Sequence, residues 1–348
     1  MTIKKSSPSF LIIHVTRIGD TIMGSAAIRA VARAFPESEI TCMGHPKRFT
    51  ILKLPFVNNL GAITKNRAPW LDRFSGRRFD YALVYGFDMA LVKYALRLSK
   101  RVIAFRQHDE TLNRQLYKMV EPPIIGSMPG VKQLLLLPEA LDIKPDGFYL
   151  SYHVEEAERS WAINKLRTLF TEKSRPIVGL QIQSFPTKPY RDWPVDSFIE
   201  LCKKILKSYD KTQFLLLGGP LDQDKIIPFK IVLGDKLHVL AGTLSLRESA
   251  AVMEQLDVYV GVDTGPTHIA GALNIPMVAL YHCLHPSRCL QPLENSRVHV
   301  IDLPVLESEC SSANNMSLIS VDDVWRKVQS ALNTPKIEEV SYTAGIQL

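Results

Sequence analysis

Short apolar runs alternate with longer amphipathic segments along the first half of the chain. FLIIHV (10–15) and YALVYG (81–86) have the length and composition of buried strands. TIMGSAAIRAVARAF (21–35) and MALVKYALRLS (89–99) carry apolar residues at helical spacing. The same pattern predicts further strands at 39–44, 60–65 and 101–105, and a short helix at 47–54. Such alternation is typical of an α/β protein with a parallel, doubly wound sheet.

A second α/β series begins at PIVGLQI (176–182), after a Pro- and Gly-rich stretch and a charged helix predicted at 151–174. Its later elements are predicted as helices at 197–209, 246–256 and 321–332, and strands at 212–219, 237–242, 258–262 and 277–281. We therefore predict two Rossmann-like domains that face a cleft, where ligands usually bind. The predicted divisions are an N-terminal domain at 1–165, a C-terminal domain at 175–335 and a tail at 336–348.

Length and composition fit two soluble domains. The chain has 348 residues, of which 46% are apolar and 22% are charged. No run approaches the ~18 apolar residues of a membrane span, and the N-terminal apolar run is too short for a signal-peptide core. We therefore expect a cytoplasmic protein. The five cysteines are scattered and form no CxxC pair, which favours reduced structural thiols over disulfides or a zinc site.

Charge is distributed unevenly along the chain, which carries +7 overall. Residues 1–150 hold 22 Lys and Arg against 12 Asp and Glu, a net charge of +10. Residues 151–348 hold 20 against 23, a net charge of −3. The asymmetry indicates that the first half meets an anionic partner: nucleic acid, a phosphorylated substrate or an anionic membrane. Scattered cations that only keep the protein soluble are the alternative.

The segment DVYVGVDTGPTHIAGALNIPMVALY (257–281) joins an apolar strand to a helix of small residues through a tight polar turn. The turn consists of Asp263, Thr264, Gly265, Pro266, Thr267 and His268. Pro suits the start of a helix, Gly permits close backbone approach, and the threonines add hydroxyl groups. A helix N-terminus after a parallel strand presents free N–H groups to an anion. We predict a phosphate or pyrophosphate site; the alternative is that Asp263 and Thr264 only cap the helix.

Two other loops carry polar residues after predicted strands. LLLGGPLDQD (215–224) has Gly218 and Gly219 for a sharp turn and Asp222 as a candidate acceptor for ribose hydroxyls. SFPTKPYRDWP (184–194) offers Lys188 and Arg191 for phosphate charge. For the first segment, ordinary loop chemistry is an equally good explanation. For the second segment, the alternative is a solvated basic loop with a core tryptophan.

The first predicted strand leads into HVTRIGDTIMGSAAIRAV, which lacks the GxGxxG spacing of a dinucleotide site. Arg17, Gly19 and Asp20 stand there at the entrance to a helix. Asp20 is either a helix cap or a carboxylate at the cleft that takes a proton from an attacking hydroxyl. Its place near a helix N-terminus predicts a low pKa.

These segments together resemble the lipopolysaccharide heptosyltransferases of glycosyltransferase family 9. The resemblance covers almost the whole chain and rests on RIGDTIMGSAAIRAVARAFPESEITCMG, YRDWP, LLLGGPLD, LAGTLSLRESAAVMEQLDVYVGVDTGPTHIAGALNIPMVALY and ISVDDVWRKVQSAL, in this order. It implies a GT-B fold and an enzyme that transfers heptose from ADP-heptose to a lipopolysaccharide or lipooligosaccharide inner core. It also implies inversion at the sugar and no required metal or other cofactor.

The resemblance also implies roles for single residues. Asp20 would be the general base, with Arg17 and Gly19 on the acceptor side. The donor would be bound by Lys188, Arg191, Gly218, Gly219, Asp222, Asp263, Thr264, Gly265, Pro266, Thr267 and His268, with the Thr264 and Gly265 backbone on its phosphates. Two features depart from the family pattern. Arg191 stands where Lys is usual, and HCLHPSRCLQPL after Tyr281 replaces a Gly-Pro-Thr-Asp kind of sequence.

The expected reaction is direct displacement of ADP by an acceptor hydroxyl that Asp20 deprotonates. The basic half would face a phosphorylated acceptor at the cytoplasmic face of the inner membrane, a peripheral contact. Alternatives are a transferase for another nucleotide sugar and a nucleotide- or sugar-binding protein without turnover. A nucleic-acid binder is suggested only by charge, because no aromatic-basic motif supports it.

Overall fold

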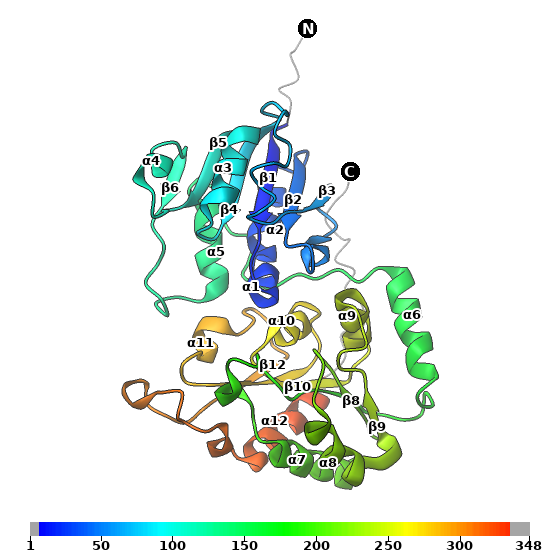
Figure 1. Cartoon of the computed structure of the whole chain (residues 1–348). Coiled ribbons are helices and arrows are strands. Elements are labelled where there is room, and N and C mark those ends of the chain that lie inside the picture. The colour runs from blue at the N-terminus through cyan, green and yellow to red at the C-terminus, as the bar shows by residue number, and fades with distance from the viewer. Residues whose placement is uncertain (1–6, 335–348) are drawn as a thin grey trace.

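Two six-stranded parallel sheets form the two halves of the molecule (Figure 1). The computed structural model describes residues 7–334. The first sheet has the order β3-β2-β1-β4-β5-β6 and the second has the order β12-β11-β10-β7-β8-β9. Counted within its own half, each sheet therefore has the Rossmann order 3-2-1-4-5-6. The predicted α/β class and doubly wound parallel sheets are confirmed.

The strands of the two sheets are β1 Ser9–His14, β2 Glu39–Gly44, β3 Asn59–Ala62, β4 Phe79–Tyr85, β5 Ser99–Phe105, β6 Lys118–Val120, β7 Ile177–Gln181, β8 Gln213–Leu216, β9 Leu237–Val239, β10 Val258–Val262, β11 Met277–Tyr281 and β12 Val298–Asp302. The α-helices are α1 Ile18–Met23, α2 Ser25–Ala34, α3 Met89–Leu98, α4 Glu110–Asn113, α5 Gly130–Glu139, α6 Glu156–Arg167, α7 Val195–Ser208, α8 Gln223–Leu233, α9 Leu246–Glu254, α10 Gly265–Ala272, α11 Ser287–Leu290 and α12 Val321–Leu332. Within residues 7–334, no helix has both the length and the apolar character needed to span a bilayer.

Several predicted elements differ from those observed. The helix predicted at 21–35 is two helices, α1 and α2, which meet at Gly24. The charged helix predicted at 151–174 is α6 alone, because a capping box between Glu155 and Glu158 starts it late. Helix α8 and strand β12 were not predicted. Pro228 interrupts the helical pattern of α8, and β12 is only half buried.

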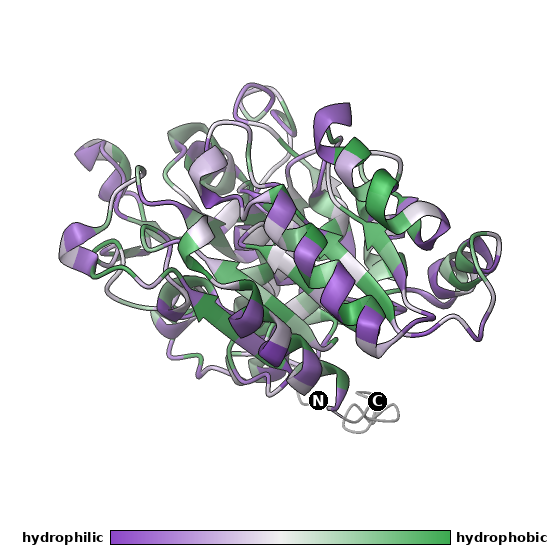
Figure 2. Ribbon diagram, turned by 90° about the horizontal axis from the view of Figure 1, so that it is seen from below, coloured by the Kyte–Doolittle hydropathy of each residue, from purple (hydrophilic) through white to green (hydrophobic). Residues whose placement is uncertain are grey.

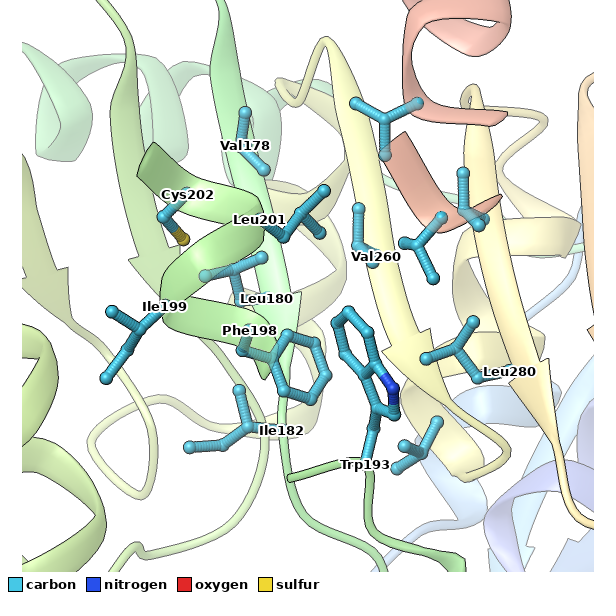
Figure 3. Packing of buried hydrophobic residues seen from close by; sticks show 14 of the residues in the cluster. Val178, Leu180, Ile182, Trp193, Phe198, Ile199, Leu201, Cys202, Val260 and Leu280 are labelled. Atoms are coloured by element: carbon cyan, nitrogen blue, oxygen red, sulfur yellow. The ribbon is translucent and has the colours of Figure 1, made fainter. Parts of the chain in front are cut away.

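Apolar side chains cover both faces of each sheet, and the strands stand out as the hydrophobic parts of the fold (Figure 2). On one face of the second sheet, Trp193 packs edge-on against Phe198 of α7, with ring centroids 4.8 Å apart (Figure 3). The Trp193 indole N–H donates to the Ile319 carbonyl at 3.0 Å. This anchor fixes the start of α7, and with it the loop that follows β7.

The carboxyl ends of the two sheets face each other, and α1 lies against α10 where the halves meet (Figure 1). A Cβ on Gly19 would lie 2.6 Å from His268 Cδ2, and one on Gly265 would lie 2.6 Å from Ile18 Cγ2. Only glycine permits so close an approach.

Helix α6 packs against α9 of the second half, where Arg159 donates to Glu254 at 2.8 Å. The predicted domain division places α6 with the first half. That division stays a prediction. The predicted tail at 336–348 lies outside the described residues.

Candidate active site

A cavity of ≈ 610 Å³ lies between the two halves and is lined by loops at the carboxyl ends of both sheets. Of the residues predicted for the site, it is lined by Arg17, Gly19, Asp20, Lys188, Arg191, Gly218, Gly219, Asp263, Thr264, Gly265, Pro266 and His268. Asp222 and Thr267 are not part of the lining. Residues more than 200 positions apart in the sequence therefore meet at one site.

Asp20 lies in the first turn of α1 and faces the second half of the molecule across the cavity. Burial raises the pKa of its carboxyl, and the nearby His268 and Arg17 offset this only in part. The low pKa predicted from the helix N-terminus is therefore wrong in direction. The helix is only six residues long, so its dipole is outweighed by desolvation. A raised pKa suits a general base.

The first half also brings two cations to the cavity. Arg17 lies over the Phe185 ring, 5.3 Å from its centroid. Arg48 donates from Nε to the Thr16 carbonyl and lines the cavity beside Asp20. Sequence reasoning missed Arg48 because it follows β2, far from the motifs around Asp20 and Asp263.

Asp263 forms the buried centre of the second half of the site. Its carboxylate pairs with Arg191, and His268 Nε2 lies 3.5 Å from its other oxygen. Burial alone would raise the pKa of Asp263, but His268 and the Arg191 charge bring it below its ordinary value. Arg191 also donates to the Asp263 carbonyl. These side chains therefore hold one another in place, which leaves Arg191 less free to meet a ligand than its sequence position indicates.

The turn between β10 and α10 presents backbone rather than hydroxyl groups. The Thr264 and Thr267 hydroxyls both donate back to the Val262 carbonyl, at 3.3 and 2.6 Å. Neither Asp263 nor Thr264 caps the helix with its side chain. In the described part of the chain, the Gly265 N–H has no protein acceptor. The turn thus keeps the features of an anion site, although its threonine hydroxyls, contrary to prediction, are engaged within the protein.

In the loop between β8 and α8, Gly218 lines the cavity and Asp222 does not. Gly218 has φ +102 and packs on the Gln181 side chain, so it supplies the sharp turn expected of it. Asp222 is exposed at the start of α8, outside the cavity lining. Pro220, Leu221 and Leu244 instead give this end of the cavity an apolar wall.

A cluster that sequence reasoning missed lies at the other end of the cavity. His285 Nε2 lies 3.4 Å from Lys188 Nζ and 3.3 Å from the Tyr190 hydroxyl. Burial, together with the charges of Arg191 and Lys188, lowers the pKa of His285 to about 4. Burial and the same kind of repulsion, from Arg191 and Arg17, lower the pKa of Lys188. The signal in the sequence was the unusual segment after Tyr281.

Cys283 and Cys310 form a disulfide, which corrects the prediction of reduced, unpaired thiols. The two cysteines are 27 residues apart, and their meeting depends on how the segment after β12 folds back on β11. The spacing of the two cysteines in the sequence therefore did not indicate a disulfide. His282 lies beside them, with the three potential ligand atoms within 4.8 Å of one another. While the sulfurs are bonded to each other, they are not available as metal ligands.

Two Rossmann-order sheets with a cavity between their carboxyl ends are the arrangement of the GT-B fold. Residues 83–317 match glycosyltransferase family 9 (heptosyltransferase). The chain therefore belongs to this family and is a glycosyltransferase.

Relatives and solved structures agree with this assignment. The chain is 23% identical to lipopolysaccharide heptosyltransferase 2 of Escherichia coli K12, over 94% of this chain and 99% of that protein. It is 28% identical to lipopolysaccharide heptosyltransferase 1 of Campylobacter coli, over 78% and 82% of the two chains. The structure of E. coli ADP-heptose lps heptosyltransferase II matches with a TM-score of 0.75 at 21% identity, over 93% of this chain and 98% of that one. A family 9 glycosyl transferase from Veillonella parvula gives 0.79 at 17% identity, over 93% and 97%.

Proposed function

We propose that this protein transfers heptose from ADP-heptose to the inner core of a lipopolysaccharide or lipooligosaccharide, with inversion at the sugar. The observation that carries the proposal is the Asp20 carboxylate, which faces the β10–α10 turn across one cavity. Asp20 takes the proton from the acceptor hydroxyl as that oxygen attacks the anomeric carbon. The bond to the diphosphate breaks, and ADP leaves from the opposite face of the sugar.

The donor diphosphate is stabilised by groups of the protein, so the proposal requires no metal or other cofactor. The α10 N-terminus offers backbone N–H groups, and Lys188 adds a cation at the same cavity. The apolar wall of Pro220, Leu221 and Leu244 suits a planar base. The names of the heptosyltransferase relatives support the sugar and the acceptor.

The test begins with thermal unfolding in the presence of ADP, UDP, GDP, CMP and NAD. A ligand at 100 times its dissociation constant adds ~2.7 kcal/mol to the free energy of unfolding. We expect stabilisation by ADP alone, followed by transfer from ADP-heptose to truncated core acceptors with EDTA present. Stabilisation by another nucleotide instead of ADP would mean that the donor is a sugar of that nucleotide. Binding of ADP without transfer to any acceptor would favour a binding protein without turnover.

Peripheral contact with an anionic membrane forms part of the proposal, because the acceptor is anchored in lipid. The first half carries the charge of +10 given above. The loop between β6 and α5 ends in a tight turn, in which Ser127 N–H donates to the Ile124 carbonyl at 3.0 Å and Gly126 has φ +80. This turn exposes 82% of Ile124 and 100% of Ile125. Arg288 of the second half donates to Gly126 at 2.7 Å, so the turn lies where the halves meet.

Cosedimentation with phosphatidylglycerol vesicles tests this contact. The double variant I124S/I125S should lose at least about tenfold in vesicle binding, because it removes two apolar side chains from the bilayer. The matched control is W70S/F74S, which changes side chains that are 69% and 97% exposed on the loop between β3 and β4. Equal binding by I124S/I125S and the wild type, or loss only in the control, would contradict the assignment of this turn.

A further inference from the structure

The segment after β11 brings an imidazole into the cavity. His285 lines the cavity together with Lys188, Asp263 and Gly265, the residues around the anion-binding turn. The family resemblance gave no counterpart for it, since HCLHPSRCLQPL replaces the expected sequence there. The structure therefore shows what this chain places at that position of the site.

The neighbours of His285 fix which ring nitrogen carries the proton. Nε2 lies 3.4 Å from the Lys188 ammonium and 3.3 Å from the Tyr190 hydroxyl. An ammonium can only donate, so Nε2 must accept. Besides Tyr190, the charged and titratable groups around the ring are Arg191, Lys188, Asp263 and His282. Burial, Arg191, Lys188 and His282 lower the pKa of His285 to about 4, and the Asp263 carboxylate, which acts in the opposite direction, offsets this only in part. A neutral ring whose Nε2 accepts must carry its proton on Nδ1.

The loop that carries His285 is held from several sides. His282 donates from Nε2 to the Asn314 carbonyl at 3.1 Å, and its Nδ1 accepts from the Leu284 N–H at 3.2 Å. The Cys283–Cys310 disulfide ties the loop to the segment after β12. Ser287 N–H donates to Asp302 at 2.7 Å. The ring of His285 is thus pre-positioned, which limits the entropy lost when it binds a ligand.

In the part of the chain that the structure describes, no protein group accepts from His285 Nδ1. A half-buried N–H donor at a cavity wall, next to a lysine, is a complement to an anionic oxygen. The apolar wall at Pro220, Leu221 and Leu244 lies after β8 and β9, whereas His285 follows β11, on the other side of the β10–α10 turn. A nucleoside at the apolar wall with its first phosphate at the turn would direct the second phosphate toward His285.

We infer that His285 donates a hydrogen bond from Nδ1 to the distal phosphate of a bound nucleoside diphosphate, beside the Lys188 ammonium. His285 thereby makes the site prefer a diphosphate over a monophosphate and stabilises the diphosphate as it departs from the sugar. The inference rests on the proposed nucleotide-sugar function.

Three substitutions at position 285 separate this role from a structural one. The Asn amide nitrogen can occupy the place of Nδ1, whereas the Gln amide extends toward the place of Nε2. Titration calorimetry with ADP and with AMP measures the preference directly. H285A and H285Q should lower ADP affinity by about tenfold or more, the usual effect of a hydrogen bond to a charged group. AMP affinity should stay within about twofold, and H285N should recover most of the ADP affinity.

Two further readouts decide between roles. H285A should lower kcat for transfer, and its effect should be the same from pH 6 to 9, because the ring is neutral throughout that range. Equal losses for ADP and AMP would indicate a structural role and overturn the inference. Normal ADP affinity with weaker binding of the intact ADP-sugar would assign His285 to the sugar and also overturn it. If the wild-type protein binds UDP rather than ADP, the proposed ADP-sugar donor is wrong. The role of His285 is then tested by the same comparison between UDP and UMP, so the two proposals can fail independently.

Discussion

The two halves of the molecule share one strand order but contribute unequally to the site. In the second half, the loops after β7, β8, β9, β10 and β11 all reach the cavity. In the described part of the first half, only α1 with the residue before it, and Arg48 after β2, do so. The second half thus borders the cavity along much of its carboxyl edge, whereas the first half adds a carboxylate and two cations on one side.

Under the proposed function, this difference would assign donor binding to one half and proton transfer to the other. A nucleotide needs many contacts, and residues 151–348, with a net charge of −3, would make them with glycines, backbone groups and a few cations. The first half leaves much of its carboxyl edge exposed, including Phe87, Ile124 and Ile125. In the proposed reaction, one Rossmann sheet would bind the donor, while its counterpart would present the Asp20 carboxylate and leave room for an acceptor.

Substitution of Asp20, the proposed base, should have the largest effect on turnover. Asp20→Asn should lower kcat by about 10²–10⁴-fold, the usual contribution of a general base, while ADP affinity stays within about twofold. Steady-state kinetics and calorimetry measure the two effects. The matched control is Asp222→Asn, which changes a carboxylate that the structure places outside the cavity. Wild-type turnover by Asp20→Asn, or an equal loss in both variants, would remove Asp20 from the role of base.

The two cations that the second half places at the cavity, Arg191 and Lys188, should have different roles: Arg191 should stabilise the fold and Lys188 should bind the ligand. Arg191→Ala leaves Asp263 buried without its ion-pair partner, so we expect a loss of about 3–5 kcal/mol in the free energy of unfolding. Lys188 has a more open position, and Lys188→Ala should weaken ADP binding with less than about 1 kcal/mol of lost stability. Urea unfolding and calorimetry on both variants test the contrast. The reverse pattern would mean that Arg191 serves the ligand and Lys188 the fold.

The close contact between the two halves at Gly265 and Ile18 can be tested by substitution. Its substitution by Ala places a methyl group against Ile18, so Gly265→Ala should lower kcat/KM by about tenfold as the halves are held apart. Ile18→Ala makes room, and the double variant should regain most of the loss, as expected for residues in direct contact. If the double variant stayed as slow as Gly265→Ala alone, the methyl group would be obstructing the donor instead.

The smallest expected effect is in the pH profile. Because burial raises the pKa of Asp20, kcat/KM should fall with decreasing pH through a value above the ordinary aspartate range. At higher pH the carboxyl is ionised and this limb should be flat. The residual activity of Asp20→Asn should lack the limb. A limb within the ordinary range would show that the carboxyl is solvated during turnover.

Strong local patterns allowed much of the fold to be predicted. Strands β2, β10 and β11 have the predicted bounds because they are short apolar runs between turn residues. Strand β12 was missed because its residues are only half buried and carry no clear apolar pattern. The order of strands within a sheet depends on contacts between distant segments, so the shared Rossmann order appears only in the structure.

Motifs of consecutive residues could be predicted to lie together at one cavity. All of the turn from Asp263 to His268 except Thr267 lines the cavity, together with Asp20. Side-chain directions were not predictable: the Thr267 hydroxyl turns inward and Asp222 turns to solvent. His285 was missed because its role depends on Lys188 and Tyr190, which lie 97 and 95 positions away.

The packing of α6 on α9 determines where the two halves of the chain can be separated in a chimeric protein. Because α6 packs on the second half, the described chain passes from the first half to the second in the short stretch before Glu156. A chimera joined just before Glu155 would keep together α6 and the second-half loops that line the cavity. It would exchange Asp20, Arg17 and Arg48 as one unit. Under the proposed function, such an exchange would alter the acceptor side while the side that binds the nucleotide stays unchanged.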